Sequence, residues 1–203
     1  MGITERRERE REEVRRKILD AARDLFASEG YDRVTMRGIA DTIEYSPTTI
    51  YNHFEDKDDL VHSLCSEDFA KLLGALHQAR PASEPVDRVR ELGRAYAAFG
   101  LGYPNHYRFM FMTPGKVEHP NAGDPGFQAF ALVHGAVAEA VESGAFWKGD
   151  PLTMARVLWA GLHGAVSLLI TLNQDQWPQG PAGPELVDAV IDNGIRGFLR
   201  QER

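Results

Sequence analysis

The polar residues with the clearest chemical potential lie in one short stretch, SPTTIYNHF, at positions 46–54. Within it, Thr48, Thr49 and Asn52 carry small hydrogen-bond donors and acceptors, and the threonines also carry methyl groups. Groups of this kind contact the edges of DNA bases, the phosphate backbone or the thymine methyl group. The stretch therefore predicts a segment that reads DNA; the alternatives are an aromatic-rich corner of a helical core and, for Thr48, simple helix capping.

The same stretch has the features of a helix start. Ser46 offers a side-chain oxygen for the N-cap, and Pro47 at the first helical position loses no hydrogen bond. Ile50 and Phe54 are four residues apart, so they share one helical face and are expected to be core residues. We therefore predict a short helix with one buried edge, and we count Ser46 among the residues at the DNA surface.

Other residues in and around this helix add candidate DNA contacts. Arg37 can donate two hydrogen bonds to a guanine, a contact that contributes about 1–3 kcal/mol of base discrimination; a solvated arginine is the alternative. Tyr51 and His53 suit phosphate, which positions a helix without reading sequence, although His53 can instead pack against the next helix. Thr35 and Lys57 lie at expected helix starts, where backbone amides favour a phosphate.

Overall charge gives no support for a nucleic-acid partner. The net charge is −7, and residues 1–60 contain 11 Lys/Arg against 15 Asp/Glu, a net of −4. Any DNA site must therefore depend on locally placed cations. The first 17 residues lean basic, with 7 Lys/Arg against 5 Asp/Glu. Their arginines either fold onto DNA or form a solvated helix with their glutamate neighbours; these are Arg6, Arg7, Arg9 and Arg11.

The elements that must position these side chains are helices. Apolar residues recur at helical spacing from Val14 and Ile18 onward, Gly30 ends the first helix, and Asp56 can cap a long later one. No segment of useful length alternates as a strand would. We predict an all-α chain of about nine helices, in which residues 35–54 form a helix, a tight turn and a second helix.

A long series of spaced positions runs through the first third of the chain: Ile18-x-x-Ala21-Ala22-x-x-Leu25-Phe26, Gly30-Tyr31, Val34-Thr35-Met36-x-x-Ile39-Ala40, Ser46, Thr49-Ile50-Tyr51-x-His53-Phe54, Lys57 and Leu60. This series resembles the TetR family of transcriptional regulators over about residues 12–72. The resemblance implies an N-terminal three-helix helix-turn-helix domain, with its motif at 35–54, that places its second motif helix in the major groove. Glu44 departs from the family, whose turn usually has glycine; a non-glycine residue in a left-handed turn costs about 1 kcal/mol.

The rest of the chain resembles the family more weakly. PNHYRFMF at 104–111, together with Trp159-x-x-x-His163-Gly164, is similar to one TetR branch named for its Trp-His-Gly motif. The resemblance implies a larger helical domain over residues 80–201 that binds a ligand and forms the dimer.

Aromatic and apolar residues past position 80 are the candidates for a ligand pocket. A small-molecule site needs an apolar cavity with a few polar anchors, although large apolar residues are more often ordinary core. The candidates are Phe99, Tyr103, Phe109, Met110, Phe127, Phe130, His134, Trp159 and His163.

The last two long helices have broad apolar faces, and glycines at 161, 164, 194 and 197 would allow close helix approach. Two such helices from each subunit could form a four-helix dimer interface. The expected interface residues are Leu158, Leu162, Ala165, Leu169, Leu186, Val190, Ile195 and Phe198.

Other classes of site and location have little support. We find no defensible catalytic pattern and no metal-ligand spacing around the histidines, so no catalytic residue, metal or cofactor is expected. Cys65 is the only cysteine, which suits a reducing cytoplasm. The first residues lack the apolar core of a signal peptide. Residues 157–174 carry no formal charge over 18 positions, a length near the minimum for a transmembrane helix. Their polar residues favour a helix buried within a soluble protein, so no membrane partner is expected.

These observations and the resemblance imply a cytoplasmic, ligand-responsive transcriptional regulator, a repressor rather than an activator and not an enzyme. We expect it to bind a palindromic double-stranded DNA operator as a homodimer and to be released by a small molecule of unknown identity. One alternative is a helical small-molecule carrier or enzyme whose helix-turn-helix no longer binds DNA, which the net charge of −4 favours. Another is a protein-interaction module built on the same helices.

Overall fold

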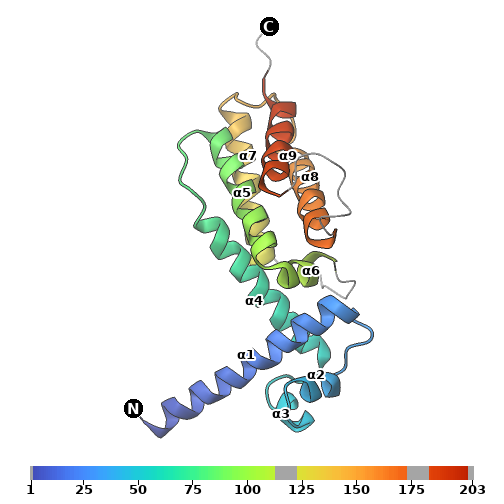
Figure 1. The fold of residues 1–203 in the computed structure, drawn as a ribbon. Helices are drawn as coiled ribbons and strands as arrows, with labels where there is room; N and C mark the ends of the chain where they lie inside the picture. Colours follow the sequence, from blue (N-terminus) through green and yellow to red (C-terminus); the bar gives the residue numbers. More distant parts are fainter. Residues whose placement is uncertain (1, 113–122, 173–182, 201–203) are drawn as a thin grey trace. The chain divides into compact units, whose positions relative to one another are not determined.

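The computed structural model describes residues 2–112, 123–172 and 183–200. Within these ranges the regular elements are nine helices and no strand, which confirms the all-α prediction (Figure 1). The helices are α1 (Ile3–Glu29), α2 (Met36–Thr42), α3 (Pro47–Tyr51), α4 (Lys57–His77), α5 (Pro85–Gly102), α6 (Pro104–Met112), α7 (Pro125–Glu142), α8 (Pro151–Thr171) and α9 (Pro184–Phe198).

The described residues form two compact units. The N-terminal unit comprises residues 2–68 and 105–112, and the C-terminal unit comprises 69–104, 123–172 and 183–200. Helix α4 is continuous and contributes residues to both. The sequence places the domains at 12–72 and 80–201, and those boundaries stay a prediction; the contacts group most of α6 with the N-terminal unit.

The N-terminal unit is built around the apolar stripe of α1. Ile18, Ala22 and Phe26 are four residues apart, so they share one face, and all are buried. Gly30 then ends the helix with φ +83°, a conformation that costs glycine little. The core also takes residues from α2, α3, α4 and α6, namely Met36, Ile39, Ala40, Ile50, Leu60, Val61, Leu64 and Phe109, and Val34 and Phe54 from the connecting segments.

A buried ion pair joins α1 to α4. The Arg23 guanidinium donates to both carboxylate oxygens of Asp68, at 3.0 and 2.9 Å, and to Asp20 at 2.7 Å. Burial opposes the charge on Arg23, but the hydrogen bonds and charges of the two aspartates outweigh it and raise the pKa of Arg23. The pair therefore keeps α1 and α4 in a fixed register.

Helix α6 docks on α1 although it lies about eighty residues further along the chain. The Phe109 ring stacks on Phe26 with centroids 5.6 Å apart, and the Asn105 side-chain amide donates to Asp24 at 2.9 Å. These contacts explain why α6 groups with the N-terminal unit rather than with its sequence neighbours.

The C-terminal unit is a bundle of α5, α7, α8 and α9. Proline occupies the start of each of these helices, where its missing N–H costs nothing. Two arginines of α5 pair with α9, Arg90 with Asp192 at 3.0 Å and Arg94 with Asp188 at 2.8 Å. Among the described helices, α8 alone is long and apolar enough to cross a membrane, a test that core helices of soluble proteins also pass; here it packs against α5, α7 and α9.

Candidate nucleic-acid interface and ligand cavity

The segment at 35–54 folds as two short helices joined by a tight turn. Thr35 caps α2 by accepting from the Gly38 amide at 3.0 Å, and Ser46 caps α3 by accepting from the Thr49 amide at 3.2 Å. Between them the Tyr45 amide donates to the Ala40 carbonyl at 3.0 Å. The predicted helix starts are confirmed.

Glu44 adopts the left-handed conformation at the turn, with φ +58°. It is the only non-glycine residue with positive φ among the described residues. The turn therefore keeps a geometry in which glycine would be unstrained, and Glu44 pays a conformational cost of about 1 kcal/mol there.

Helix α3 has one buried and one exposed face. Ile50 is fully buried and Phe54, just past the helix, is 2% exposed, which confirms both as core residues. Thr48, Tyr51 and Asn52 are exposed, and Tyr51 is exposed by 55%. Arg37, on α2, is exposed as well. The polar groups that would contact DNA are thus accessible, while the apolar residues fix the helix on its neighbours.

The first turn of α4 is a poor phosphate site, contrary to the expectation for Lys57. The Lys57 ammonium donates to the Tyr31 carbonyl and lies 3.8 Å from the centre of the Tyr31 ring. The Asp56 carboxylate accepts from the Asp59 amide at 2.8 Å, and Asp58 accepts from the Tyr31 hydroxyl. Three carboxylates at this helix start repel a phosphate, and the lysine is turned inward.

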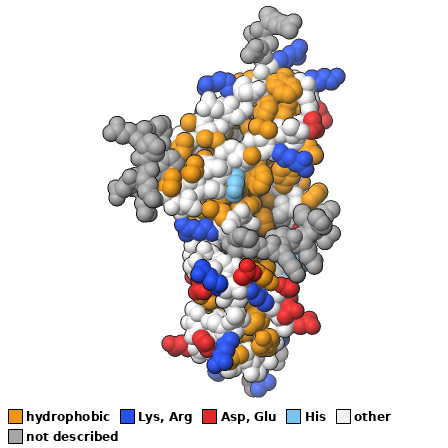
Figure 2. Space-filling view, turned by 90° about the vertical axis from the view of Figure 1, so that its right-hand side faces the viewer, with side chains coloured by type: hydrophobic (Ala, Val, Ile, Leu, Met, Phe, Trp, Pro, Cys, Tyr) orange, Lys and Arg blue, Asp and Glu red, His pale blue; other side chains and the backbone are white. Residues whose placement is uncertain are grey.

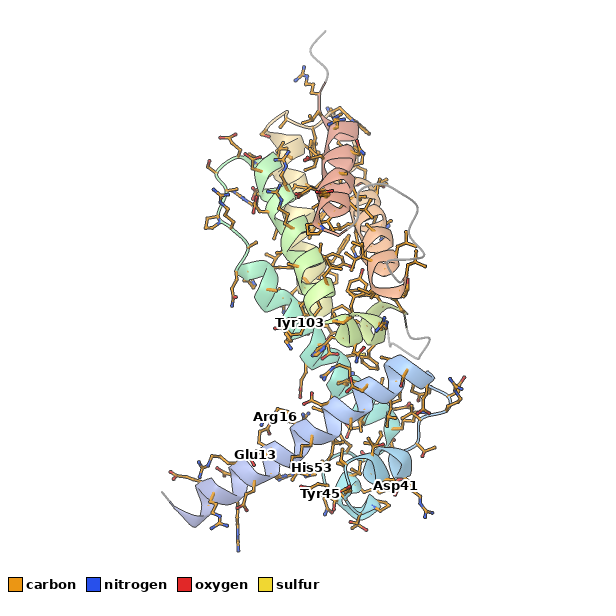
Figure 3. All side chains as sticks on the ribbon, in the orientation of Figure 1. Glu13, Arg16, Asp41, Tyr45, His53 and Tyr103 are labelled. Carbon is orange, nitrogen blue, oxygen red and sulfur yellow. The ribbon has the colours of Figure 1, made fainter. Side chains whose placement is uncertain are left out.

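Cations from α1 lie beside α3 instead. The guanidinium of Arg15 lies 5.1 Å from the centre of the Phe54 ring, and the Lys17 ammonium lies 5.8 Å from that of Tyr45. Burial, followed by the nearby charges of Arg11 and Arg15, lowers the pKa of His53. Figure 3 shows His53 and Tyr45 against α1.

Sequence reasoning named Arg11 but missed Arg15 and Lys17 as cations near the reading helix. The available signal was the four-residue spacing from Arg11 to Arg15, which puts both on the face of α1 that continues into the core at Ile18. Identifying Lys17 required the position of the turn at Tyr45, which the sequence does not give.

A small cavity of about 50 Å³ lies inside the C-terminal bundle. All four helices of the bundle contribute to its wall, and its lining is apolar except for one phenol and one indole. The lining residues are Val89, Leu92, Gly93 and Tyr96 from α5, Val133 from α7, Leu158, Trp159 and Leu162 from α8, and Val190, Ile191 and Ile195 from α9.

A chain of polar groups runs along one side of this cavity. The Trp159 indole donates to the Tyr96 hydroxyl at 3.2 Å, that hydroxyl lies 3.5 Å from Nδ1 of His163, and Nε2 of His163 lies 3.3 Å from the Ser167 hydroxyl. The rings of Trp159 and His163 also lie 5.5 Å apart. Burial lowers the pKa of His163, which favours the neutral imidazole.

The predicted pocket residues are only partly brought together. Trp159 lines the cavity and His163 adjoins it. Phe109 belongs instead to the core of the N-terminal unit, because it stacks on Phe26. The Tyr103 ring packs at a tilt against that of Phe99, with centroids 5.5 Å apart. None of the other predicted residues lines the cavity: Phe99 and Met110 are buried, Phe130 and His134 are half-buried, and Tyr103 and Phe127 are exposed.

Sequence reasoning missed the α5 residues Val89, Leu92 and Tyr96, which form an apolar stripe at helical spacing and line the cavity. The stripe itself was the usable signal, because its tyrosine adds a polar group to an otherwise apolar helical face. The stripe forms a cavity wall because α5 packs against α8 and α9, and sequence spacing does not show that packing.

Several expected interface residues lie inside the subunit. Leu162 and Ile195 are 6% and 2% exposed and line the cavity, and Ala165 is 5% exposed. These three side chains therefore cannot form an intersubunit surface, which corrects their assignment. Leu158 and Val190 also line the cavity but are half-buried, as are Leu169, Leu186 and Phe198.

The apolar surface of the C-terminal unit lies on a different face of α8. Val157 and Leu168 are 53% and 48% exposed, and Gly161 and Gly164 lie between them at steps of four, three and four residues. That spacing makes one stripe along the helix. Helices α8 and α9 lie on the right-hand side of Figure 1, which faces the viewer in Figure 2. Figure 2 shows hydrophobic side chains gathered on this face of the C-terminal unit.

No group of three or more potential metal ligands occurs in the part of the chain that the structure describes. Cys65 is half-buried, and burial, followed by the charge of Asp68, raises the pKa of its thiol to about 11. Such a thiol stays protonated at neutral pH, so it is a weak nucleophile.

Two family models match the chain. The one described as "Bacterial regulatory proteins, tetR family" matches residues 18–64, and the one described as "Tetracyclin repressor-like, C-terminal domain" matches residues 89–193. The second alone covers more than half of the chain. Neither match identifies the Trp-His-Gly branch that the sequence resembles.

Curated relatives are similar mainly in the N-terminal part. The chain is 45% identical over 58 residues to the HTH-type transcriptional repressor Rv1474c of Mycobacterium tuberculosis, covering 29% of this chain and 31% of that protein. It is 29% identical over 93 residues to the HTH-type transcriptional regulator UidR of Escherichia coli, covering 45% and 47%. The chain thus matches less than half of the length of these relatives.

Solved structures match over nearly the whole chain. A TetR family transcription regulator from Marinobacter aquaeolei VT8 superposes with a TM-score of 0.79 at 17% identity, covering 96% of this chain and 100% of that one. A protein with unknown function from Rhodococcus sp. RHA1 gives a TM-score of 0.67 at 26% identity, covering 92% and 96%. The first of these shows the fold alone.

Proposed function

Because this chain belongs to the TetR family of bacterial transcriptional regulators, we propose that it is a repressor that binds a palindromic operator as a homodimer and leaves it when a small molecule binds the C-terminal unit. The observation that carries the proposal is α3, a capped helix with a buried apolar edge and an exposed polar face beside cations of α1. A bacterial protein that binds an operator acts in the cytoplasm, which is the location we propose.

Sequence reading falls to the exposed residues of the motif. Arg37, Thr48 and Asn52 supply the guanidinium, hydroxyl and amide groups that hydrogen-bond to base edges. Tyr51 and His53 suit phosphate contacts, which position the helix but carry no sequence information. Capping hydrogen bonds at the starts of α2 and α3 involve Thr35, Ser46 and Thr49. The hydroxyl groups of these residues can also contact phosphate.

Local cations offset the negative overall charge. At about 0.15 M salt, charges are screened over about 8 Å, so the distant carboxylates of an acidic protein matter less than the cations nearest the DNA. Arg11, Arg15 and Lys17 lie beside the reading helix in the folded unit. Arg11 and Lys17 are the candidates for the phosphate contacts that the inward-turned Lys57 does not make, whereas Arg15 is already paired with Glu67.

A homodimer would place two reading helices in successive major grooves, about 34–36 Å apart. The exposed apolar stripe of α8, with glycines at its centre, suits close packing against the same helix of a second copy. A two-fold axis between two copies requires an operator with matching two-fold symmetry.

Release by ligand requires that the ligand prefer the conformation that does not bind DNA. A tenfold bias needs about 1.4 kcal/mol of differential affinity. The cavity lies in the C-terminal unit, and α4 is one continuous helix with residues 57–68 in the N-terminal unit and 69–77 in the C-terminal unit. We propose that a change at the cavity tilts α4 and alters the spacing of the two reading helices.

The alternative is a small-molecule carrier or enzyme with a helix-turn-helix that no longer binds DNA. The net charge of −4 over residues 1–60 favours it. A selection from genomic fragments at low salt distinguishes the two proposals. Recovery of a shared palindromic sequence supports the regulator, whereas a pool without any enriched sequence favours the carrier or enzyme.

A further inference from the structure

The wall of the bundle cavity has a narrow chemistry. Among the described residues, eleven line it; nine of these are aliphatic or glycine, the other two are Tyr96 and Trp159, and none of the eleven is charged. Tyr96 is 6% exposed, so most of its side chain is withdrawn from water. A charged ligand group would lose its hydration in this cavity without gaining an opposite charge, which is strongly unfavourable.

On the polar side of the cavity, one hydrogen bond can be replaced by a hydrogen bond to a ligand. The Trp159 indole can only donate, so the Tyr96 oxygen accepts from it, and the Tyr96 proton can go to Nδ1 of His163. That second link is 3.5 Å long, at the limit of a hydrogen bond, whereas the indole link is 3.2 Å. The Tyr96 proton is therefore the group that a ligand can take over at the lowest cost.

His163 gives no positive charge to attract an anion. Its ring lies between Tyr96 and Ser167 in the polar chain, and burial lowers its pKa. At neutral pH the imidazole is uncharged, so it holds the Tyr96 hydroxyl in place as a hydrogen-bonding partner. In this role His163 is a positioning residue.

We propose that the effector is an uncharged, mainly apolar molecule with one neutral hydrogen-bonding group, such as an alcohol, which pairs with the Tyr96 hydroxyl. This inference rests on the ligand-responsive function proposed above and names the class of molecule that the site takes. It excludes carboxylates and ammonium compounds as effectors of this cavity.

Entry of such a molecule must enlarge the cavity. Ligand sites for drug-sized molecules span about 300–1,000 Å³, against about 50 Å³ here. Trp159 is 38% exposed, and the other residues that line the cavity are buried or half-buried. Because Trp159 lines the cavity and donates to Tyr96, a ligand that enters should change the surroundings of its ring, so the emission of Trp159 should report occupancy.

Four probes that share one benzene ring test the proposal: toluene, benzyl alcohol, benzoate and benzylammonium. Each is titrated at pH 7.5 into the full-length Trp147→Phe/Trp177→Phe variant, which leaves Trp159 as the only tryptophan. Benzyl alcohol and toluene are expected to change the Trp159 emission with saturation. Benzoate and benzylammonium are expected to bind at least tenfold more weakly, because their charges have no partner.

Matched variants in the same background locate the binding. Tyr96→Phe is expected to weaken benzyl alcohol at least fivefold and to leave toluene within twofold, because it removes only the hydroxyl. Tyr103→Phe, a tyrosine outside the cavity, should change neither probe. Gly93→Val fills the space where a Cβ would already meet Ile191 at 3.2 Å and Leu162 at 3.6 Å, and should weaken both probes. Thermal melting confirms that each variant is folded.

Three results would overturn the inference: benzoate or benzylammonium binding as tightly as benzyl alcohol, an equal loss of toluene and benzyl alcohol in Tyr96→Phe, or no saturable binding of any probe. DNA release is measured separately, on a sequence selected from genomic fragments. Binding of benzyl alcohol without release supports the ligand class and contradicts ligand-controlled repression. Sequence-specific DNA binding without any probe binding contradicts the ligand class and leaves the DNA-binding function intact.

Discussion

At the scale of single residues, α3 divides its side chains between two roles. Ile50 and Phe54 are buried and fix the helix, and Thr48, Tyr51 and Asn52 are exposed. This division explains why so short a helix carries so many polar and aromatic residues.

Arg37→Ala should relax base preference at one position of each half-site. A bidentate arginine–guanine contact discriminates by about 1–3 kcal/mol, so the variant should lose about 5- to 150-fold of its preference at that base pair. Competition between single-base operator variants measures this. Arg33→Ala is the matched control, since Arg33 donates to the Glu29 carbonyl at 2.7 Å. An equal loss on every DNA sequence would show that Arg37 contacts phosphate instead.

Glu44→Gly should stabilise the N-terminal unit by about 1 kcal/mol, because glycine adopts φ +58° without the strain of a Cβ. Urea unfolding measures the change in the free energy of unfolding. Glu44→Ala removes the same charge but keeps the Cβ, so it should give no such gain. A matching gain in both variants would assign the effect to charge.

His163 should titrate below about pH 6.5, the ordinary value of a histidine, because burial lowers its pKa. The unfolded chain then binds a proton more readily than the folded chain. The free energy of unfolding should therefore fall as the pH drops below about 6.5, and His163→Gln should make that fall shallower. NMR titration of the His163 ring gives the midpoint directly; a midpoint above 6.5 would reverse the sign.

At the scale of elements, local signals in the sequence were sufficient to predict where helices begin. Thr35, Ser46 and Asp56 each cap a helix as predicted, because a cap depends on residues within three positions. The ends of the motif and the all-helical pattern follow from the same short-range physics.

Contacts between distant segments could not be predicted in this way. The docking of Phe109 on Phe26 and the hydrogen bond from Trp159 to Tyr96 each join residues more than sixty positions apart. Lys57 had the spacing of a phosphate-binding lysine, but Tyr31 holds it through its carbonyl and its ring. Such outcomes depend on tertiary packing, which periodicity does not encode.

The buried pair between α1 and α4 should dominate the stability of the N-terminal unit. Asp68→Asn leaves the buried Arg23 charge with only the exposed Asp20 carboxylate as its partner and should cost about 3–5 kcal/mol. The double variant Arg23→Met/Asp68→Leu removes both charges and should recover most of that loss. Chemical unfolding of both variants is the measurement. If Asp68→Asn alone costs less than 1 kcal/mol, the pair contributes little.

At the scale of the whole molecule, the proposed function depends on two copies of the chain. The exposed stripe of α8 suits an interface, and several residues that the sequence assigned to that interface line the cavity instead. A helix in a four-helix bundle must share its apolar residues between the bundle interior and any partner, and the sequence alone does not say which residues go where.

The double variant Val157→Glu/Leu168→Glu should convert the proposed homodimer to a monomer, because it places charges on a face that dimerisation would remove from water. Ala131→Glu, at an exposed position of α7, should leave the dimer intact. Sedimentation velocity measures both. A dimer that persists in the double variant would place the interface elsewhere.

The measurement that tests the central claim most directly is the affinity of the full-length protein for a selected palindrome, over a range of salt concentrations. The same DNA with one half-site scrambled is the comparison. A dimeric repressor predicts that scrambling sharply weakens binding, and that affinity for the palindrome falls linearly with salt on logarithmic axes, as phosphate contacts require. Equal affinity for both DNAs, or binding that does not depend on salt, would contradict the account.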